Sequence, residues 1–354
     1  MYRILVINPG STSTKVALYK GDKSVWNETL AYSNEQLAGF EKIIDQLEMR
    51  RLDVEKTLHK KKLDVKSLSA VVGRGGPFKP LESGTYKVSE DLLRDIRSGN
   101  VQAEHISNIG ALLAHEIAEQ AGVPAFFVDP VSVDEFEPVA RISGIPELER
   151  KSLLHALNIK ATAHRAAKDL GRSLSDLNLI VVHLGGGISI CPIRKGRVID
   201  ANNANEGGPF SPERSGSLPV SSLAKLCYSG TFSYAEMKKR LVGNGGLIAH
   251  LGTNDSIEIE RRIEAGDKQA RLVYEAMAYQ IAKEIGAMAT VLKGEVDAIL
   301  LTGGLAKSDV LIHWIKERVA FLAPVVVYAG ENEMEALALG ALRVLKGEEE
   351  AKTY

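Results

Sequence analysis

The chain has 354 residues, of which 45% are apolar and 25% charged, the balance of a soluble globular protein, and this excludes disordered and fibrous classes. At roughly 100–200 residues per domain, this length predicts two lobes with a sizeable core. The 44 basic and 45 acidic side chains leave a net charge of −1, so neither nucleic acid nor an anionic membrane is an expected partner.

The N-terminus and the cysteines indicate a cytoplasmic protein. A strand-like run from Tyr2 to Ile7 opens the chain, without the basic segment and apolar stretch of a secretory signal. No uninterrupted apolar run approaches the roughly 20 residues that a membrane helix needs. Cys191 and Cys227 are too few for a disulfide framework, and their surroundings lack the ligands of a zinc site.

An apolar strand that runs into a glycine-containing turn occurs three times along the chain. The first copy is RILVINPGSTSTKVALY at residues 3–19, and the second is LIVVHLGGGISICPI at residues 179–193. Both predict a β-hairpin. The third copy, AILLTGGLAKSD at residues 298–309, predicts a strand followed by a helix from about Ser308. This repeat predicts a duplicated α/β unit with a ligand held between the two lobes.

The segments between the first two copies alternate between helix and strand. Residues 48–66 are dense in charge, but acidic residues interleave the basic ones and no aromatic residue is present, so a solvated helix surface is expected. Apolar residues recur at helical spacing from Ile106 to Ile117, Gly122 ends that helix, and residues 126–129 predict a strand.

Two further helices are predicted in the second half of the chain. The longer one, which ends at Gly294, is expected to be buried and is marked by the apolar residues Leu272, Ala276, Tyr279, Ile281, Ile285 and Met288. The last, at about residues 333–346, is expected to pack on the first lobe. The alternation predicts the α/β class. We place the first lobe at residues 1–152 plus about 335–354, and the second at 153–334.

The glycine turns carry the pattern of phosphate recognition. Residues 8–15, NPGSTSTK, combine a turn of backbone amides with hydroxyls and a lysine, and the absence of a Gly-Lys-Ser/Thr ending excludes a Walker loop. Residues 183–189, HLGGGIS, place three glycines at a strand end, where close approach of a ligand is expected. An ordinary polar turn explains the first motif equally well. The pair Gly303 and Gly304 is more typical of a simple turn.

The motifs NPGSTSTK, HLGGGISI, ERSGS and LLTGG, in this order and at these spacings, resemble the acetate and butyrate kinase family. That family is a branch of the actin, Hsp70 and sugar kinase superfamily. The resemblance implies two lobes of duplicated actin-like (ribonuclease H-like) ATPase units, with ATP and Mg²⁺ in the cleft between them. It further implies direct in-line transfer of the γ-phosphoryl group to a short-chain carboxylate, and a homo-oligomer.

Two arginines suit a transfer between anions, because guanidinium groups neutralise repulsion and stabilise the transition state. Arg74, in VVGRGGP, and Arg214, in PERSG, match the arginines of the family. A surface ion pair is the alternative role of either. His155 and His183 match family histidines near the transferred phosphoryl group and the ATP phosphates, and His105 matches a third; alternatively, these are hydrogen-bonded core residues.

The resemblance also assigns carboxylates and the nucleotide contacts. Asp129, at the end of the strand at 126–129, matches the catalytic aspartate, and Glu333 matches the Mg²⁺-associated glutamate, although Glu331 and Glu335 are close alternatives. All three glutamates also suit a helix N-terminus. Asp255 resembles the residue that contacts the nucleoside, and Asn8 is expected at the metal or phosphate. The remaining expected nucleotide contacts are Ser11, Ser13, Lys15, Gly185, Gly186, Gly187, Gly303 and Gly304.

Departures from the acetate kinase pattern favour the butyrate kinase branch. RSGS at 214–217 stands in place of RSGD, LHA at 154–156 in place of FHG, and residues 206–216, EGGPFSPERSG, look like the butyrate kinase branch. The expected reaction converts butanoate and ATP into butanoyl phosphate and ADP. An acetate or isobutyrate kinase, a sugar kinase with Asp129 as base, and an actin- or Hsp70-like binding protein remain alternatives.

Overall fold

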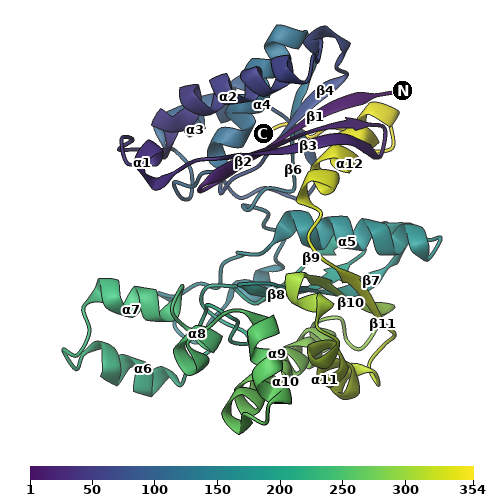
Figure 1. Cartoon of the computed structure of the whole chain (residues 1–354). Coiled ribbons are helices and arrows are strands. Elements are labelled where there is room, and N and C mark those ends of the chain that lie inside the picture. Colours follow the sequence, from purple (N-terminus) through teal and green to yellow (C-terminus); the bar gives the residue numbers. More distant parts are fainter. The chain divides into compact units, whose positions relative to one another are not determined.

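A computed structural model describes all 354 residues, and they form two compact units. Unit 1 comprises Met1–Asp134 and Asn332–Tyr354, and unit 2 comprises Glu135–Glu331. Both termini lie in unit 1 (Figure 1). None of the helices combines the length and the apolar character that crossing a membrane requires.

Unit 1 contains a six-stranded sheet in the order β3-β2-β1-β4-β6-β5. Its elements are β1 Arg3–Gly10, β2 Ser13–Lys20, β3 Lys23–Ala31, α1 Asn34–Leu37, η1 Ile43–Gln46, α2 Leu47–Lys60, η2 Val65–Ser67, β4 Ala70–Arg74, β5 Thr85–Lys87, α3 Glu90–Ser98, α4 Asn108–Ala121, β6 Ala125–Val128 and α12 Glu333–Lys346. β1, β4 and β6 are parallel, whereas β1, β2 and β3 form an antiparallel meander. The first predicted hairpin, the helix that Gly122 ends, and the last helix are thereby confirmed.

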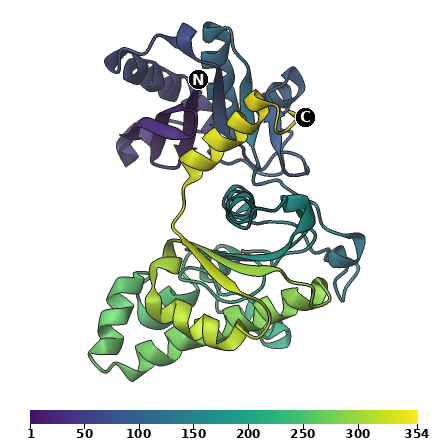
Figure 2. The same ribbon diagram turned by 90° about the vertical axis from the view of Figure 1, so that its right-hand side faces the viewer.

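Helices cover both faces of this sheet. α4 packs on β4 and β6, and α2 and α3 pack on α4, whereas α12 lies across the other face over β1, β4 and β6 (Figure 2). The apolar core contains the strand residues Leu5, Ile7 and Val71 together with Ile109 and Leu113 of α4. The C-terminal helix therefore belongs to the fold of unit 1, as expected.

A pair of glycines brings α4 unusually close to β4. A Cβ atom on Gly73 would lie 2.1 Å from the carbonyl oxygen of Gly110, and one on Gly110 would lie 2.4 Å from the carbonyl oxygen of Arg74. Both neighbours are backbone atoms that a side chain cannot displace cheaply. The contact therefore requires glycine on both sides, and it fixes the backbone that carries Arg74.

Unit 2 contains a five-stranded sheet in the order β11-β10-β7-β8-β9. Its elements are η3 Pro138–Arg141, α5 Ala156–Asp169, η4 Leu174–Asp176, β7 Asn178–Leu184, β8 Ile188–Arg194, β9 Arg197–Val198, α6 Val220–Cys227, α7 Tyr234–Leu241, α8 Gly246–Leu251, α9 Ser256–Glu264, α10 Lys268–Val291, β10 Ala298–Gly303, η5 Gly304–Lys307, α11 Asp309–Val319 and β11 Val325–Ala329. α5 packs on β7 and β10, and α10 packs on β7 and β8. The second hairpin is confirmed, and the third repeat ends in a helix that Ser308 caps.

The long predicted helix is α10, but only some of the residues that were expected to be buried on it are buried. Ile281, Ile285 and Met288 are buried, whereas Leu272 and Tyr279 are 65% and 48% exposed. At about 100° per residue, the stripe through Leu272 and Tyr279 lies nearly opposite the stripe through the later residues. The buried residues of the first half are instead Val273, Tyr274 and Met277, with their neighbours.

The two sheets share one plan. The order β3-β2-β1-β4-β6 in unit 1 matches β9-β8-β7-β10-β11 in unit 2, with the first three strands antiparallel and the last two parallel to the central one. The match includes β10·β11, which pair in parallel as β4 and β6 do. The α/β class and the duplicated unit are thereby confirmed.

The chain passes from unit 1 to unit 2 between Asp134 and Glu135, compared with the expected 152/153. The Asp134 amide donates to the Leu81 carbonyl in unit 1, whereas the Glu135 carboxylate accepts from the Val198 amide in unit 2. On the return, the division falls between Glu331 and Asn332, compared with the expected 334/335. Backbone hydrogen bonds, which composition does not reveal, set these positions.

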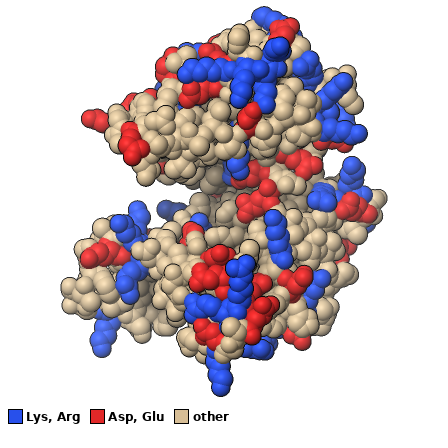
Figure 3. Space-filling model, viewed as in Figure 1, with Lys and Arg blue, Asp and Glu red and all other residues tan.

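The charge-dense segment forms α2 and the turn that follows it. Figure 3 shows Lys and Arg side chains over this part of unit 1, interspersed with acidic ones. Arg51 pairs with Glu48 and Glu55, and Lys61 pairs with Glu28. The outer face is the solvated surface expected, but the inner face buries Arg50 and Val54, which the charge pattern did not indicate.

Candidate active site

In both units, several of the candidate residues lie at the carboxyl ends of the parallel strands. In unit 1, Asn8 lies near the end of β1, Arg74 ends β4, and Asp129 follows β6. In unit 2, His183 lies near the end of β7, and Gly303 ends β10. Ligands bind at this edge in open α/β sheets, because loops diverge there and leave backbone groups accessible.

Asn8, Arg74 and Glu333 form one cluster in unit 1. The Asn8 Nδ2 donates to Glu333 Oε2 at 2.9 Å, and Arg74 Nη1 forms an ion pair with Glu333 Oε1. Glu333 is the first residue of α12, so the packing of α12 on the sheet brings it to the ends of β1 and β4. The structure thus brings together three residues that are far apart in sequence and that were predicted to act together.

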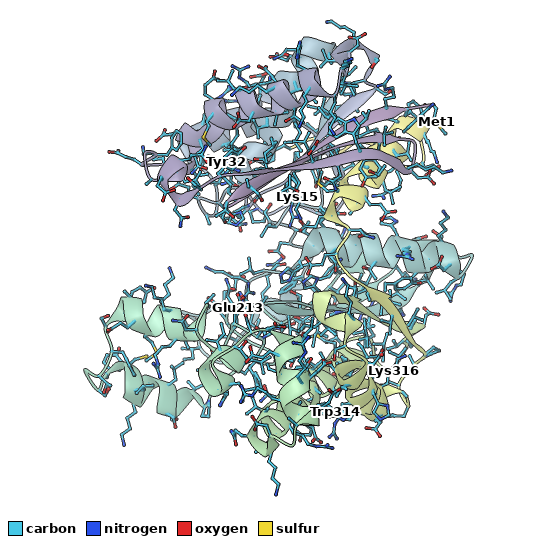
Figure 4. The ribbon with its side chains drawn as sticks, in the orientation of Figure 1. Met1, Lys15, Tyr32, Glu213, Trp314 and Lys316 are labelled. Atoms are coloured by element: carbon cyan, nitrogen blue, oxygen red, sulfur yellow. The ribbon has the colours of Figure 1, made fainter.

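The charges around Glu333 favour its ionised form. Burial would raise the pKa of Glu333, but the Arg74 charge, hydrogen bonds from Arg74 and Asn8, and the Lys15 charge outweigh it, so that the pKa is lowered. Lys15 is the cross-strand partner of Asn8 in the β1·β2 pair, and Figure 4 shows it on this sheet. Ser13 precedes it by two residues and shares its face of β2.

The other two candidate glutamates have different neighbours. Burial first and the charge of Glu335 second raise the pKa of Tyr19, which places Glu335 near β2. Glu331 lies in unit 2, where its Oε1 is 3.3 Å from His183 Nε2. Of the three, Glu333 is the one that contacts Asn8 and Arg74.

One nitrogen atom of Arg74 is left without a hydrogen bond. Its Nε is buried without a hydrogen-bond partner, although Nη1 is paired with Glu333. His105 lies within electrostatic reach, because desolvation first and the Arg74 charge second lower the pKa of His105. The His105 Nδ1 bonds to Ser107 at the start of α4.

Asp129 follows β6 in a strained conformation. Its φ of 39° is positive, a region that non-glycine residues adopt rarely. Its Oδ1 accepts from the Gly84 amide at 2.7 Å, its own amide donates to the Gly84 carbonyl, and the residue is 3% exposed. Strain of this kind is concentrated at functional sites.

In unit 2, His183 and His155 stack on each other. Their ring centroids are 3.9 Å apart and nearly parallel. His155 Nδ1 bonds to Ser189 Oγ at 2.9 Å, and Ser189 is the direct cross-strand partner of His183. Because an amide oxygen only accepts, His183 Nδ1 donates to Asn158 Oδ1 at 2.8 Å, which directs Nε2 towards Glu331.

The positions of Asn8 and His183 correspond in the duplicated plan. Each precedes a glycine by two residues at the end of the central strand, and each contacts the start of a covering helix. Asn8 contacts Glu333 at the start of α12, and His183 contacts His155 at the start of α5. The duplication thus places polar groups at equivalent points of both units.

The turn of three glycines in unit 2 accommodates two charged side chains. A Cβ atom on Gly187 would lie 2.2 Å from Arg214 Nη1, and one on Gly186 would lie 3.4 Å from the Glu213 carboxylate. Arg214 Nη1 donates to the Ala204 carbonyl at 3.0 Å, and burial lowers the pKa of Arg214. Figure 4 labels Glu213 in this part of unit 2.

Replacing Gly187 with alanine tests this arrangement. The atoms in the way are the end of the flexible Arg214 side chain, so we expect Gly187→Ala to fold with nearly unchanged thermal stability and to displace the guanidinium. A displacement of this size should lower kcat by about tenfold or more. Steady-state kinetics and thermal unfolding measure both. Gly286→Ala, on α10 of the same unit, is the control, because nothing lies within 4 Å of the added atom. Wild-type kcat in Gly187→Ala would show that the position of Arg214 is not critical.

Two predicted nucleotide contacts have structural roles in the fold. Gly303 has a φ of 92°, and a Cβ atom there would lie 2.3 Å from the Leu184 carbonyl oxygen, so the packing of β10 beside β7 by itself requires glycine. The Asp255 carboxylate caps α9 by accepting from the amides of Ile257 and Glu258. Its neighbour Asn254 instead donates to Glu213 at 2.8 Å.

Four residues of these clusters were missed: Asn158, Ser189, Glu213 and Asn254. Two had a signal in the sequence. Asn158 follows His155 by three residues, the spacing that places two side chains on one side of a helix. Ser189 is the polar residue of the strand between the three glycines and Arg194. Glu213 and Asn254 lie in irregular segments, and no periodicity points to them.

Comparison with solved structures identifies the class of the fold. The chain is similar to acetate kinase from Porphyromonas gingivalis, with a TM-score of 0.80, 18% identity, and coverage of 98% of this chain and 100% of that one. It is also similar to a propionate kinase from Francisella tularensis subsp. tularensis, with a TM-score of 0.74, 20% identity, and coverage of 96% and 99%. The chain therefore has the fold of these two structures, which is built from two duplicated α/β units.

The family follows from the sequence matches. The model of the acetokinase family matches residues 148–323. A protein of Caldanaerobacter subterraneus subsp. tengcongensis, named probable butyrate kinase 2, is 54% identical over 354 residues, which is 100% of both chains. The chain belongs to the acetokinase family, which confirms the resemblance seen in its motifs.

Proposed function

We propose that the chain is a carboxylate kinase that converts butanoate and ATP into butanoyl phosphate and ADP. One observation carries this proposal: the 54% identity to the relative named probable butyrate kinase 2 extends over the full length of both chains, so all the candidate site residues lie within the match. The cluster of Asn8, Arg74 and Glu333 supports it, because a transfer between anions needs such opposed charges.

Each group has a role in this proposal. The first hairpin turn, with Ser11, Ser13 and Lys15, and the turn of Gly185, Gly186 and Gly187, with His183, bind the ATP phosphates. Arg74 and Arg214 neutralise the acceptor carboxylate and the equatorial oxygens of the transferred group. His155 lies near the transferred group, and Asp129 is the catalytic aspartate, as the family motifs imply. A carboxylate acceptor is already ionised at neutral pH, so no base has to deprotonate it. The Asp255 contact to the nucleoside and the Gly303–Gly304 contact to ATP remain predictions.

The residues present fit Mg²⁺. Asn8 and Glu333 offer the oxygen donors that Mg²⁺ prefers. The structure has no group of three or more His, Cys, Asp or Glu side chains that could hold a metal. The other ligands of the ion would be phosphates and water. When bound, the ion would neutralise charge on the phosphate oxygens.

Removal of the Glu333 carboxylate is expected to weaken magnesium binding specifically. Glu333→Ala should raise the Mg²⁺ concentration for half-maximal activity by about tenfold or more, and more than it raises KM for butyrate. Magnesium titrations at fixed ATP and butyrate measure this. Glu335→Ala, two residues along the same helix, is the control. If only Glu335→Ala raises the requirement, the assignment to Glu333 is wrong.

The acyl preference tests the proposed substrate. The arginines meet the same carboxylate in every short fatty acid, so only burial of the extra methylenes can discriminate among them. We expect kcat/KM for butyrate or isobutyrate to exceed that for acetate by at least about tenfold. The assay traps acyl phosphate with hydroxylamine and compares acetate, propionate, butyrate, isobutyrate and valerate at saturating MgATP.

The same assay separates the alternatives. Equal or better use of acetate would contradict the butyrate proposal and leave the phosphoryl transfer in place. Phosphorylation of glucose would indicate a sugar kinase, and ATP hydrolysis without acyl phosphate would indicate an actin- or Hsp70-like binding protein.

We also propose a cytoplasmic location and a homo-oligomer. The free thiols of Cys191 and Cys227 suit a reducing compartment, and light scattering on the purified chain tests the assembly.

A further inference from the structure

A buried arginine outside the predicted site holds the turn between β1 and β2. Arg50 lies on α2 and is 0% exposed. Its Nη1 donates to the carbonyl oxygens of Gly10 at 3.0 Å and Ser13 at 2.9 Å, and its Nη2 donates to that of Ser11 at 3.1 Å. One guanidinium therefore binds three carbonyls of a four-residue segment.

The remaining contacts of Arg50 keep it in place. Nη1 also donates to Thr14 Oγ1 at 2.9 Å, and Nε and Nη2 both donate to Gln46 on the preceding turn of helix. The guanidinium carbon lies 4.5 Å from the ring centre of Tyr32, whose hydroxyl donates to Thr14. Figure 4 labels Tyr32 in unit 1. No Asp or Glu forms an ion pair with Arg50 in the structure. Burying an unpaired charge is costly, so carbonyl dipoles of the turn must stabilise it.

The carbonyl bonds determine where the amides of the turn point. In a trans peptide, the C=O of one residue and the N–H of the next point in opposite directions. Because the Gly10 and Ser11 carbonyls face Arg50, the Ser11 and Thr12 amides face away from it. The β1·β2 pairing ends at Gly10 and Ser13. The amides of Ser11 and Thr12, which lie between them, make no hydrogen bond in the structure. Adjacent amides that converge at a turn form an anion site.

The turn also needs support from outside the hairpin. Ser11 and Thr12 form a two-residue loop, and neither has a positive φ. Two-residue hairpins favour the turn types with a positive φ, because their twist matches that of the strands. The conformation seen here is thus a less favourable one, and Arg50 bonds to the carbonyls on both sides of it.

We propose that Arg50 is a positioning residue that holds the Gly10–Ser13 turn so that the Ser11 and Thr12 amides face an ATP phosphate. Arg50 itself does not contact ATP, since it is fully buried. The role rests on the proposed function, in which this turn binds ATP.

The informative variant is Arg50→Lys. It keeps the charge, but a single ammonium group cannot reach three carbonyls together as the planar guanidinium does. We expect KM for MgATP to rise by at least about tenfold, while KM for butyrate stays within about twofold. We also expect faster amide hydrogen exchange in the peptide that spans residues 8–14, which is measured without ligand.

Two control variants on α2 separate positioning from stability. Val54→Ala removes buried apolar atoms one helical turn along and lowers the stability of unit 1, but should leave KM for MgATP unchanged. Arg51→Lys alters the neighbouring arginine, which pairs with Glu48 and Glu55, and should leave kinetics and exchange unchanged.

The KM for MgATP and the hydrogen exchange of residues 8–14 together decide whether Arg50 positions the turn. The proposal is overturned if Arg50→Lys keeps the wild-type KM for MgATP and exchanges no faster at residues 8–14 than Val54→Ala does. If the wild-type chain phosphorylates no short carboxylate, the proposed function fails. Local exchange then still shows whether Arg50 holds the turn, and unchanged exchange would overturn that as well.

Discussion

Arg74→Ala and Arg214→Ala are each expected to lower kcat by at least about a hundredfold without unfolding the chain. The reason is the loss of positive charge where the transition state spreads negative charge over the phosphoryl oxygens. Arg74 has a buried, unpartnered Nε, and Arg214 lies against Gly187, so both side chains are positioned by their surroundings. Steady-state kinetics at saturating MgATP and butyrate measure the effect, with circular dichroism as a check on folding.

Matched arginines serve as controls for this prediction. Arg51 in unit 1 and Arg150 in unit 2 also form ion pairs, with Glu48 and Asp200 respectively, and their alanine variants should keep kcat within about threefold. Lysine at position 74 or 214 should restore little activity, because it lacks the planar fork. Unchanged kcat in both Arg74→Ala and Arg214→Ala would refute the in-line mechanism proposed here.

Removal of Arg74 also leaves Glu333 without its ion-pair partner, while the hydrogen bond from Asn8 remains. The two residues should therefore show coupled effects on kcat and on the magnesium requirement in a double-mutant cycle. Arg214 belongs to unit 2, where it donates to the Ala204 carbonyl, so its effect should be additive with that of Glu333→Gln.

Gly73→Ala is expected to lower the free energy of unfolding by about 3 kcal/mol, or to prevent folding. Its Cβ atom would lie 2.1 Å from the Gly110 carbonyl oxygen and 2.5 Å from the carbonyl carbon, so α4 would have to move away from β4. The same movement would shift Arg74, the next residue. Urea denaturation measures the stability, and kinetics on the folded fraction measure the effect on Arg74.

An open glycine in the same unit provides the comparison. Nothing lies within 4 Å of a Cβ atom on Gly39, so Gly39→Ala should change the free energy of unfolding by less than about 0.5 kcal/mol. If Gly73→Ala is as stable as Gly39→Ala, the close contact between α4 and β4 is not a constraint on the fold.

Much of the local structure and the family could be predicted from the sequence. The two hairpins, the helix that ends at Gly122 and the helix at Glu333–Lys346 follow from periodicity and glycine, which act over a few residues. Even there, local pattern failed in α10, because apolar residues on opposite faces of one helix look alike until a neighbouring sheet selects the buried face. The same limit applies to Arg50. Its segment is dense in charge, and nothing in that pattern indicates that this side chain faces the core.

The amino-acid sequence by itself determined the α/β class, the duplication, the glycine turns and membership of the acetokinase family. Only the tertiary structure decided which of three glutamates meets Asn8 and Arg74, that Gly187 makes room for Arg214, and that Arg50 holds the first turn. Asn8 and Glu333 are 325 positions apart, and Arg74 and Glu333 are 259 apart. Such contacts depend on the order of parallel strands and on the packing of α12 across them, and no pattern within either segment contains that information.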